Sequence, residues 1–410
     1  MNLPTDSGLA LALQGGAPVR TAPFAPWPVF ADDERRASDA VLASGKVNYW
    51  TGEECRRFEE EFARHVGVRH AISLANGTVA LELALRALGV GPGDEVIAPA
   101  KTFIASASAA VAVGAHPVVC DVDADSQNLT AGTVRAALTP RTKAVVAVHL
   151  AGWPCDLDAL VRLCEERGIA LVEDCAQAHG ARWNDRPVGS FGRVGVYSFC
   201  QDKIMTTGGE GGMLVTDDRA LWDRAWAYKD HGKTWAAVHE RQHPPGFRWQ
   251  HEGFGSNFRM TEMQAAIGRR QLEKLARWVD QRRRNARAFA EALADVPGIA
   301  VPQPPAAAFH SYYKLYARID PGMLAPGWDV IRVIEAINRE GIPCLQGACS
   351  EIYRERAFVE RGWGPAQPLP VAAGLWETRL MFMVHPTLSE ADLQDAARAT
   401  AKVMRAATRG

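Results

Sequence analysis

The sequence predicts an α/β protein with a large N-terminal domain and a smaller C-terminal domain, and three observations indicate this fold class. The chain has 410 residues, more than the roughly 150 residues that one domain typically holds. Through the first two thirds, short apolar runs alternate with segments of helical periodicity, which is typical of a mostly parallel sheet with helices on both faces. After Asn257 this alternation gives way to a long helical pattern and then to a mixed region.

Seven apolar runs are predicted to be the strands of one mostly parallel sheet in the large domain. Between several of these runs, leucines recur at helical spacing, as at Leu81, Leu85 and Leu88, which predicts the connecting helices. The predicted strands are His70–Leu74, Glu95–Ala98, Pro117–Val122, Lys143–Leu150, Ile169–Glu173, Val194–Phe199 and Gly212–Thr216.

The C-terminal third begins with a helix signal. Thr261-Glu262-Met263-Gln264 has the form of a capping box, which predicts a helix from there to about Leu293. Proline and glycine then interrupt the pattern, so we expect a large domain over residues 1–285, including the N-terminal arm, and a small α/β domain over residues 286–410. Its predicted elements are Tyr313–Ile319, Val330–Arg339, Leu380–Val384 and Glu390–Met404.

Composition narrows the class of protein. Lysine and arginine total 46 against 47 aspartates and glutamates, a net charge of −1, which argues against a nucleic-acid partner because such binders need a positive field. The first twenty residues lack the pattern of a signal peptide, and no stretch is apolar enough to predict a membrane span. Eight cysteines without a CxxC pair are typical of reduced thiols. We therefore expect a soluble, cytoplasmic protein.

Four predicted strand ends carry polar or aromatic side chains that together suggest a site. Asp174 follows a buried strand, and Lys203 follows another and precedes the glycine-rich run Gly208–Gly212. Asn76-Gly77-Thr78 precedes a predicted helix, where backbone N–H groups can bind a phosphate. Phe103 follows a fourth strand. Each has an ordinary alternative: a helix cap for Asp174 and for Gly77–Thr78, a solvated lysine, and a core phenylalanine.

Taken together, these four groups match the requirements of one cofactor, pyridoxal phosphate. A lysine forms a Schiff base with its aldehyde, and a carboxylate keeps its pyridine nitrogen protonated. The helix N-terminus neutralises its phosphate, and an aromatic ring fixes the plane of the pyridine. Because parallel strands present their C-terminal ends at one edge of the sheet, ligands bind there, and the combination favours a cofactor site.

The sequence resembles the DegT/DnrJ/EryC1/StrS family of sugar aminotransferases, which have fold type I. The resemblance runs from about Trp27 to the C-terminal helix. It rests on Asn76-Gly77-Thr78, Glu173-Asp174-Cys175-Ala176-Gln177-Ala178, Ser198-Phe199 with Lys203, Gly208–Gly212, and Gly255-Ser256-Asn257-Phe258-Arg259-Met260-Thr261-Glu262.

The resemblance implies a role for each site residue. Lys203 would hold the cofactor and move the proton during amino transfer, and Asp174 would bind the pyridine nitrogen. Gln177 would contact the ring substituents and Phe103 would stack on the ring. The phosphate would be bound by Gly77, Thr78 and Ser198 of one subunit and by Asn257 of its neighbour. A homodimer with two shared sites would follow.

The resemblance also implies an activity. L-glutamate or L-glutamine would donate an amino group to a ketone on a sugar or cyclitol, and a nucleotide-linked sugar is the favoured acceptor. The product would serve surface-polysaccharide or natural-product synthesis. A dehydratase that aromatises an amino-cyclitol, a non-catalytic cofactor-binding regulator and a structural protein with a decayed site are the alternatives. Ala151 replaces the tyrosine of many members, and the Thr234–Glu252 loop has no predicted role.

A zinc-protease motif is present but disfavoured. His239-Glu240-Arg241-Gln242-His243 matches HExxH, which binds zinc only when a continuous helix presents both histidines on one face. Pro244-Pro245-Gly246 follows at once, and no third ligand is evident. We therefore predict no metal site. The glycine-rich runs match neither GxGxxG nor a Walker A motif, so no nucleotide cofactor is indicated.

Overall fold

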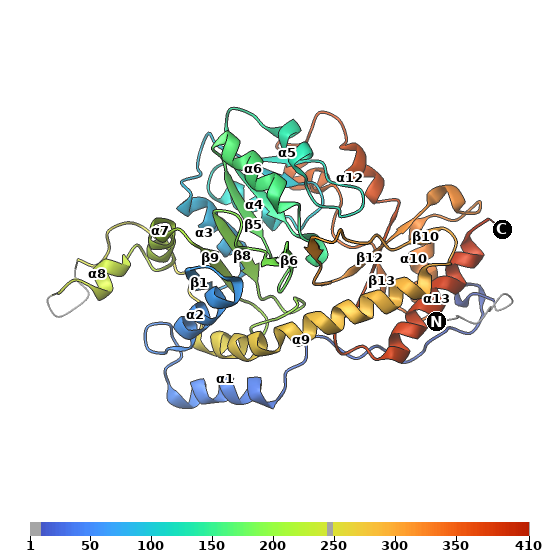
Figure 1. Cartoon of the computed structure of the whole chain (residues 1–410), viewed down its shortest axis with the longest axis horizontal. Coiled ribbons are helices and arrows are strands. Elements are labelled where there is room, and N and C mark those ends of the chain that lie inside the picture. The colour runs from blue at the N-terminus through green and yellow to red at the C-terminus, as the bar shows by residue number, and fades with distance from the viewer. Residues whose placement is uncertain (1–9, 244–248, 410) are drawn as a thin grey trace.

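The molecule is elongated, with a large α/β body and a smaller unit joined along one long helix (Figure 1). This computed structural model describes residues 10–243 and 249–409. Two helices, α1 (Asp32–Ser44) and α2 (Glu54–Val66), precede the main sheet and pack against the long helix α9 (Glu262–Leu293).

The seven predicted strands form one sheet, as expected. Its strand order is β1-β9-β8-β5-β4-β2-β3, and only β9 runs antiparallel to its neighbours, so the sheet is mostly parallel. Every residue of β2, β8 and β9 is buried, which is typical of a sheet covered on both faces. The strands are β1 (His70–Leu74), β2 (Glu95–Pro99), β3 (His116–Cys120), β4 (Thr142–Val148), β5 (Ala170–Asp174), β8 (Val194–Ser198) and β9 (Gly212–Thr216).

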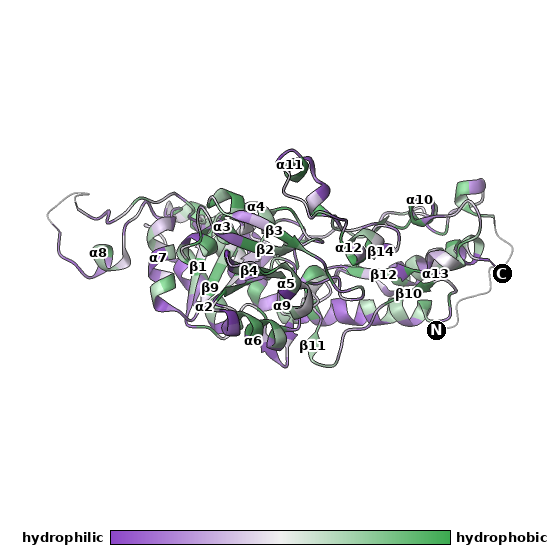
Figure 2. Ribbon diagram, turned by 90° about the horizontal axis from the view of Figure 1, so that it is seen from above, coloured by the Kyte–Doolittle hydropathy of each residue, from purple (hydrophilic) through white to green (hydrophobic). Residues whose placement is uncertain are grey.

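Helices cover the sheet, and the strands are largely hydrophobic (Figure 2). A small three-stranded sheet of order β11-β6-β7 lies beside this layer. The helices are α3 (Gly77–Ala87), α4 (Ala105–Ala112), α5 (Ala131–Ala137), α6 (Leu157–Arg167), α7 (Arg219–Lys229) and α8 (Trp235–His239), and the short strands are β6 (Arg182–Trp183), β7 (Arg186–Pro187) and β11 (Ala308–Phe309).

Helix α9 begins where the capping box predicts. The Thr261 hydroxyl accepts a hydrogen bond from the Gln264 backbone N–H, and the Gln264 side chain reaches back to the Thr261 backbone. Leu275 and Trp278 belong to the core of the large body, whereas Phe289 and Leu293 belong to a second core. The predicted division at residue 285 therefore falls inside one continuous helix, and the domain limits stay a prediction.

The smaller unit is built on an antiparallel sheet of order β10-β12-β14-β13. Leu11 of the N-terminal segment is buried in its core, and Glu340 accepts hydrogen bonds from the backbone N–H groups of Ala12 and Val19. Its elements are β10 (Ile299–Ala300), β12 (Leu315–Ile319), α10 (Val330–Arg339), β13 (Cys344–Leu345), α11 (Arg356–Val359), α12 (Pro370–Leu375), β14 (Arg379–Phe382) and α13 (Glu390–Ala407).

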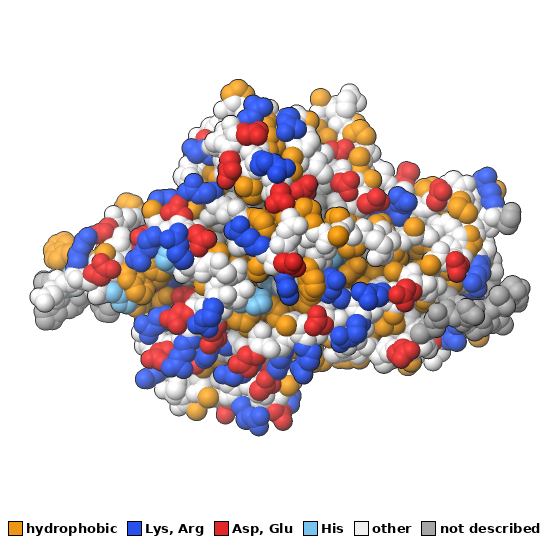
Figure 3. Space-filling model, viewed as in Figure 1, with side chains coloured by type: hydrophobic (Ala, Val, Ile, Leu, Met, Phe, Trp, Pro, Cys, Tyr) orange, Lys and Arg blue, Asp and Glu red, His pale blue; other side chains and the backbone are white. Residues whose placement is uncertain are grey.

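The surface carries charges of both signs. Over the face formed by α1, α2 and α9, basic and acidic side chains are interspersed rather than gathered into a field of one sign (Figure 3). None of the helices in the described part of the chain is long and apolar enough to cross a membrane. All eight cysteines are free thiols.

Candidate active site

The C-terminal ends of the central strands open into a cavity of about 1250 Å³ between the large body and the small unit. The structure brings seven of the eight predicted site residues to this cavity. Asn257 is exposed and does not line it among the described residues. The seven lining residues are Gly77, Thr78, Phe103, Asp174, Gln177, Ser198 and Lys203.

Asp174, the last residue of β5, presents a fixed carboxylate to the cavity. One oxygen accepts a hydrogen bond from the Ser106 hydroxyl at 2.8 Å and the other from the Ala176 backbone N–H at 3.1 Å. Burial raises the pKa of Asp174, while these two hydrogen bonds and the charge of Lys203 act in the opposite direction. A cation placed in the cavity beside this carboxylate would further stabilise its charged form.

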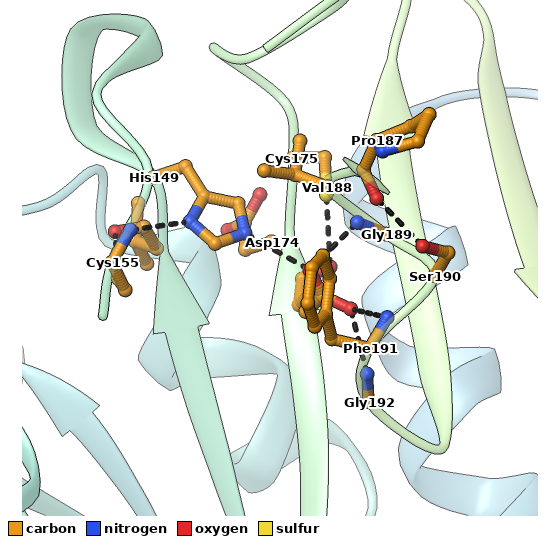
Figure 4. Close-up of polar contacts among 12 residues, drawn as sticks. His149, Cys155, Asp174, Cys175, Pro187, Val188, Gly189, Ser190, Phe191 and Gly192 are labelled. Carbon is orange, nitrogen blue, oxygen red and sulfur yellow. Dashed lines mark hydrogen bonds and ion pairs between the residues drawn. The ribbon is translucent and has the colours of Figure 1, made fainter. Parts of the chain in front are cut away.

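Glu173, the residue before Asp174 on β5, binds the backbone of the loop at Gly189–Gly192. Figure 4 shows this loop together with His149 and Asp174. The Glu173 carboxylate accepts hydrogen bonds of 2.6–2.7 Å from the backbone N–H groups of Gly189, Phe191 and Gly192. It also accepts one of 3.2 Å from His149 Nε2. His149 Nδ1 accepts the Cys155 N–H at 3.0 Å, so Nε2 carries the hydrogen.

These hydrogen bonds explain a cluster that otherwise has the composition of a metal site. Ligand atoms of His149, Glu173 and Cys175 lie within 4.8 Å of one another. Both ring nitrogens of His149 and both oxygens of Glu173 already have hydrogen-bond partners. The cluster is therefore a buried set of hydrogen-bonded side chains next to Asp174 with a structural role.

The N-terminus of α3 and the end of β8 meet at close range. The Asn76 side chain caps α3 by accepting the Val79 N–H at 3.0 Å. An added Cβ at Gly77 would lie 2.7 Å from Ser198 Cβ, so glycine is needed for the approach. Thr78 and Ser198 place two hydroxyls in the same cavity. Free backbone N–H groups at a helix N-terminus beside two hydroxyls are suited to a phosphate.

Three parts of the chain converge on Lys203. The Trp27 indole N–H, from the N-terminal segment, donates to the Lys203 carbonyl at 2.9 Å. Lys203 Nζ lies 3.7 Å from Asp202 Oδ1 and 5.0 Å from the ring centroid of Tyr313, which precedes β12. The Tyr313 hydroxyl donates to Asp202. The amine therefore lies at the junction of the two units.

The remaining two predicted residues also lie where a planar ring could bind. Phe103 lines the cavity with 67% of its surface exposed, so its ring is not a core side chain. The Gln177 side-chain oxygen accepts the backbone N–H of Ala151 at 2.8 Å, and Ala151 has a positive φ of 56°. The residue that departs from the family pattern thus holds Gln177 through its backbone.

Sequence reasoning missed several residues of this site. Ser106, Trp27 and Tyr313 contact Asp174, Lys203 and Asp202 respectively, but no motif links them to those partners. The one available signal was the position of Ser106, three residues after Phe103, at the start of a helix that follows a strand end.

The HExxH motif does not lie on one helix. Helix α8 ends at His239, whose ring centroid lies 3.9 Å from that of Trp235. His243 Nε2 contacts the Ala237 carbonyl. Because the two histidines have these separate environments, the zinc interpretation has no geometric support. The predicted turn at 244–246 lies outside the described residues.

The donor set fits pyridoxal phosphate. A lysine, a buried carboxylate, an exposed aromatic ring and a helix N-terminus with two hydroxyls line one cavity at the ends of a mostly parallel sheet. These groups suit the aldehyde, pyridine nitrogen, ring face and phosphate of that cofactor. The fold and site define a fold type I, pyridoxal-phosphate-dependent aminotransferase.

Comparison with known proteins gives the family: the chain belongs to the DegT/DnrJ/EryC1/StrS aminotransferase family, which matches residues 29–400. It is similar to the solved structure of an aminotransferase from Psychrobacter cryohalolentis, with a TM-score of 0.92 and 49% identity, covering 94% of this chain and 100% of the other.

Two curated relatives are enzymes with named substrates. L-glutamine:2-deoxy-scyllo-inosose aminotransferase of Streptomyces kanamyceticus is 36% identical, with 96% of each chain covered. UDP-N-acetyl-3-dehydro-alpha-D-glucosamine 3-aminotransferase of Acidithiobacillus ferrooxidans is 37% identical, covering 86% of this chain and 90% of that protein.

Proposed function

We propose that this enzyme transfers an amino group from L-glutamate or L-glutamine to a ketone of a sugar or cyclitol, with a nucleotide-linked sugar favoured. The observation that carries the proposal is that Lys203 and Asp174 line one cavity of about 1250 Å³, larger than the usual 300–1,000 Å³ of small-molecule sites. It has room for a cofactor and a bulky acceptor. The names of the two relatives, one acting on a cyclitol and one on a UDP-sugar, support this substrate class.

Each site residue has a proposed task. Pyridoxal phosphate, when bound, supplies an electron sink for the bonds at the carbon that carries the amino group. Lys203 holds the cofactor through its amine and then moves the proton at that carbon. Asp174, kept in place by Ser106, binds the pyridine nitrogen. Phe103 supports the ring and Gln177 contacts its substituents.

The phosphate would be held by Gly77, Thr78 and Ser198. In a homodimer with two shared sites, Asn257 would complete the neighbouring site, a role its position outside the cavity of its own chain permits. Trp249 and Phe254, on the same segment, are 80% and fully exposed, and exposed aromatic side chains of this kind often mark an interface.

Mixing two inactive variants tests the shared site. Lys203→Ala and Asn257→Ala subunits would form heterodimers in which one of two sites has both native residues. Random reassociation should then restore about a quarter of wild-type activity, since about half of the dimers are mixed. Restoration of none would place Asn257 in its own subunit's site, and an Asn257→Ala protein that is active alone would place Asn257 outside both sites. Light scattering would give the oligomeric state independently.

The amino-transfer chemistry is tested first by absorption spectroscopy. The protein with added pyridoxal phosphate should show a visible band that L-glutamate or L-glutamine bleaches. Lys203→Ala should lack the band, whereas Lys143→Ala, on the exposed side of β4, should keep it. A band that neither donor bleaches would contradict the proposed donors. With ketone acceptors, mass spectrometry then separates amino transfer from loss of water, the reaction of an aromatising dehydratase.

Cytoplasmic location stays a prediction. The eight free thiols support it, because reduced cysteines are typical of that compartment.

A further inference from the structure

The small-unit wall of the cavity carries a lysine whose charge has no carboxylate partner. Lys314 directly precedes β12, lies across from Met383, and lines the cavity. Its Nζ contacts Met383 Sδ at 3.2 Å, and a thioether is a weak acceptor. Within the described ranges, no carboxylate oxygen forms an ion pair with Lys314. Lys203 and Lys314 are the only lysines or arginines that line the cavity in the described part of the chain, and burial lowers the pKa of the lining His385 to about 4.

The surroundings of Lys314 leave its ammonium group poorly solvated. Burial lowers its pKa to about 8; the positive charges of Arg282 and Lys203 act in the same direction, and Asp202 opposes them. Asp202 is itself engaged by the Tyr313 hydroxyl and lies beside Lys203. A buried charge is costly unless it is paired, so an anionic group of a ligand would stabilise this lysine.

Lys314 and the amine of Lys203 line the same cavity and lie near the same tyrosine ring. The Nζ atoms of Lys203 and Lys314 lie 5.0 and 4.7 Å from the centroid of the same Tyr313 ring. The amino nitrogen of the donor must take the place of the Lys203 amine on the cofactor. The α-carboxylate is the first charged group along the donor from that nitrogen, two bonds away. Its oxygens therefore stay near the reacting nitrogen, in the cavity that Lys203 and Lys314 both line.

The other lysine near this wall does not offer the same access. Lys101 lies over the ring of Tyr316, 4.8 Å from its centroid, with 1% of its surface exposed, and it is not a lining residue. Lys203 itself is committed to the cofactor in the proposed function. Arg282 is 1% exposed and, like Lys101, is not a lining residue. Lys314 is therefore the cation on the cavity lining that is available to a carboxylate near Lys203.

We propose that Lys314 binds the α-carboxylate of the amino donor. This rests on the proposed aminotransferase function and adds the residue that recognises the donor as an α-amino acid. The ammonium would exchange its contact with Met383 Sδ for a charge-assisted hydrogen bond to the carboxylate. Glutamine and glutamate share this group, so both would depend on Lys314.

The test compares two ligands on matched variants. The visible band of the cofactor-loaded protein is titrated with L-glutamine and with 4-aminobutanamide, which is glutamine without its α-carboxylate. Lys314→Met should raise the half-bleaching concentration of L-glutamine about 10- to 100-fold, the range of a charged hydrogen bond, and leave that of 4-aminobutanamide nearly unchanged. Lys314→Arg should keep most of the affinity, and Lys143→Met, which removes an exposed lysine, should behave as wild type.

A second measurement needs no turnover. Calorimetry with glutarate, a dicarboxylate without an amino group, should show weaker binding to loaded Lys314→Met than to loaded wild type. An unchanged cofactor band and unfolding midpoint would establish that the variant is folded.

The outcomes separate the two proposals. If wild type forms no band or ignores both natural donors, the proposed function fails. If wild type responds and Lys314→Met responds equally well to L-glutamine, the role of Lys314 is overturned. An equal loss for L-glutamine and 4-aminobutanamide would make Lys314 a shape-determining residue, and this result would contradict the α-carboxylate assignment.

Discussion

Replacing Ser106 with alanine should weaken cofactor binding without unfolding the protein. Ser106 is buried on α4 and donates its hydroxyl hydrogen to Asp174 at 2.8 Å, so the Thr102 hydroxyl, 2.9 Å from Ser106 Oγ, donates to Ser106 in turn. A hydrogen bond to a charged group contributes about 1.5–3 kcal/mol, against about 1 kcal/mol for a neutral one. Because the bound cofactor would favour the ionised carboxylate, its binding should lose about 0.5–2 kcal/mol, which is about 2- to 30-fold in dissociation constant.

The assay is an equilibrium titration of cofactor-free protein with pyridoxal phosphate, followed by the visible band. Ser108→Ala is the matched control, because Ser108 lies on the same helix, is half-buried, and makes no side-chain hydrogen bond to another described residue. Thermal unfolding of the cofactor-free variants would show that each is folded. A Ser106→Ala protein that binds the cofactor as tightly as wild type would refute the view that Ser106 maintains the charge of Asp174.

Three other changes test separate parts of the structure. Gly77→Ala places a Cβ 2.7 Å from Ser198 Cβ and should weaken cofactor affinity at least tenfold. Gly91→Ala, whose Cβ would make only an ordinary contact of 3.9 Å with the Val113 carbonyl oxygen, should not weaken it; equal affinities of the two variants in a titration would contradict the close approach. Burial lowers the pKa of His179 to about 3, so the unfolded chain binds a proton below about pH 6.5 that the folded chain does not. The free energy of unfolding should therefore fall, because of that histidine, by about 1.4 kcal/mol for each pH unit between pH 6.5 and 3. Urea unfolding at pH 7.5 and at pH 5.5 should show a smaller fall for His179→Leu than for wild type. Glu173→Gln puts an amide nitrogen against N–H donors and should cost about 2–4 kcal/mol of unfolding free energy in the same assay; an unchanged midpoint would mean the loop is held by other contacts.

Much of the large sheet could be predicted because its strands are short, apolar and bounded by turns. His70–Leu74 and Gly212–Thr216 were predicted with the observed limits. The limits differ where backbone conformation, not hydrophobicity, ends the strand. Thus β4 stops at Val148, and Leu150, an apolar residue included in the prediction, begins a short turn that contains the positive φ of Ala151.

Only the site residues that belong to the large body could be predicted from the sequence. Parallel strands bring their ends to one edge, so Asp174, Lys203 and Gly77 could be grouped from their positions after predicted strands or before a helix. Tyr313 and Lys314 come from the other side of the cavity, and their place depends on how the small unit packs against the large one. Periodicity along the chain carries no information about that packing, and Ser106 is 68 positions from its partner.

Helix α9 makes the spacing of the active site sensitive to the length of the chain far from it. At 1.5 Å per residue its 32 residues span about 48 Å, and they anchor Trp278 in one core and Phe289 in the other. One residue inserted between these anchors would turn everything beyond it by about 100°. Lys314 would then no longer line the cavity that holds Lys203. Relatives that differ in length should therefore carry their insertions in loops, while the number of residues between the two cores stays constant.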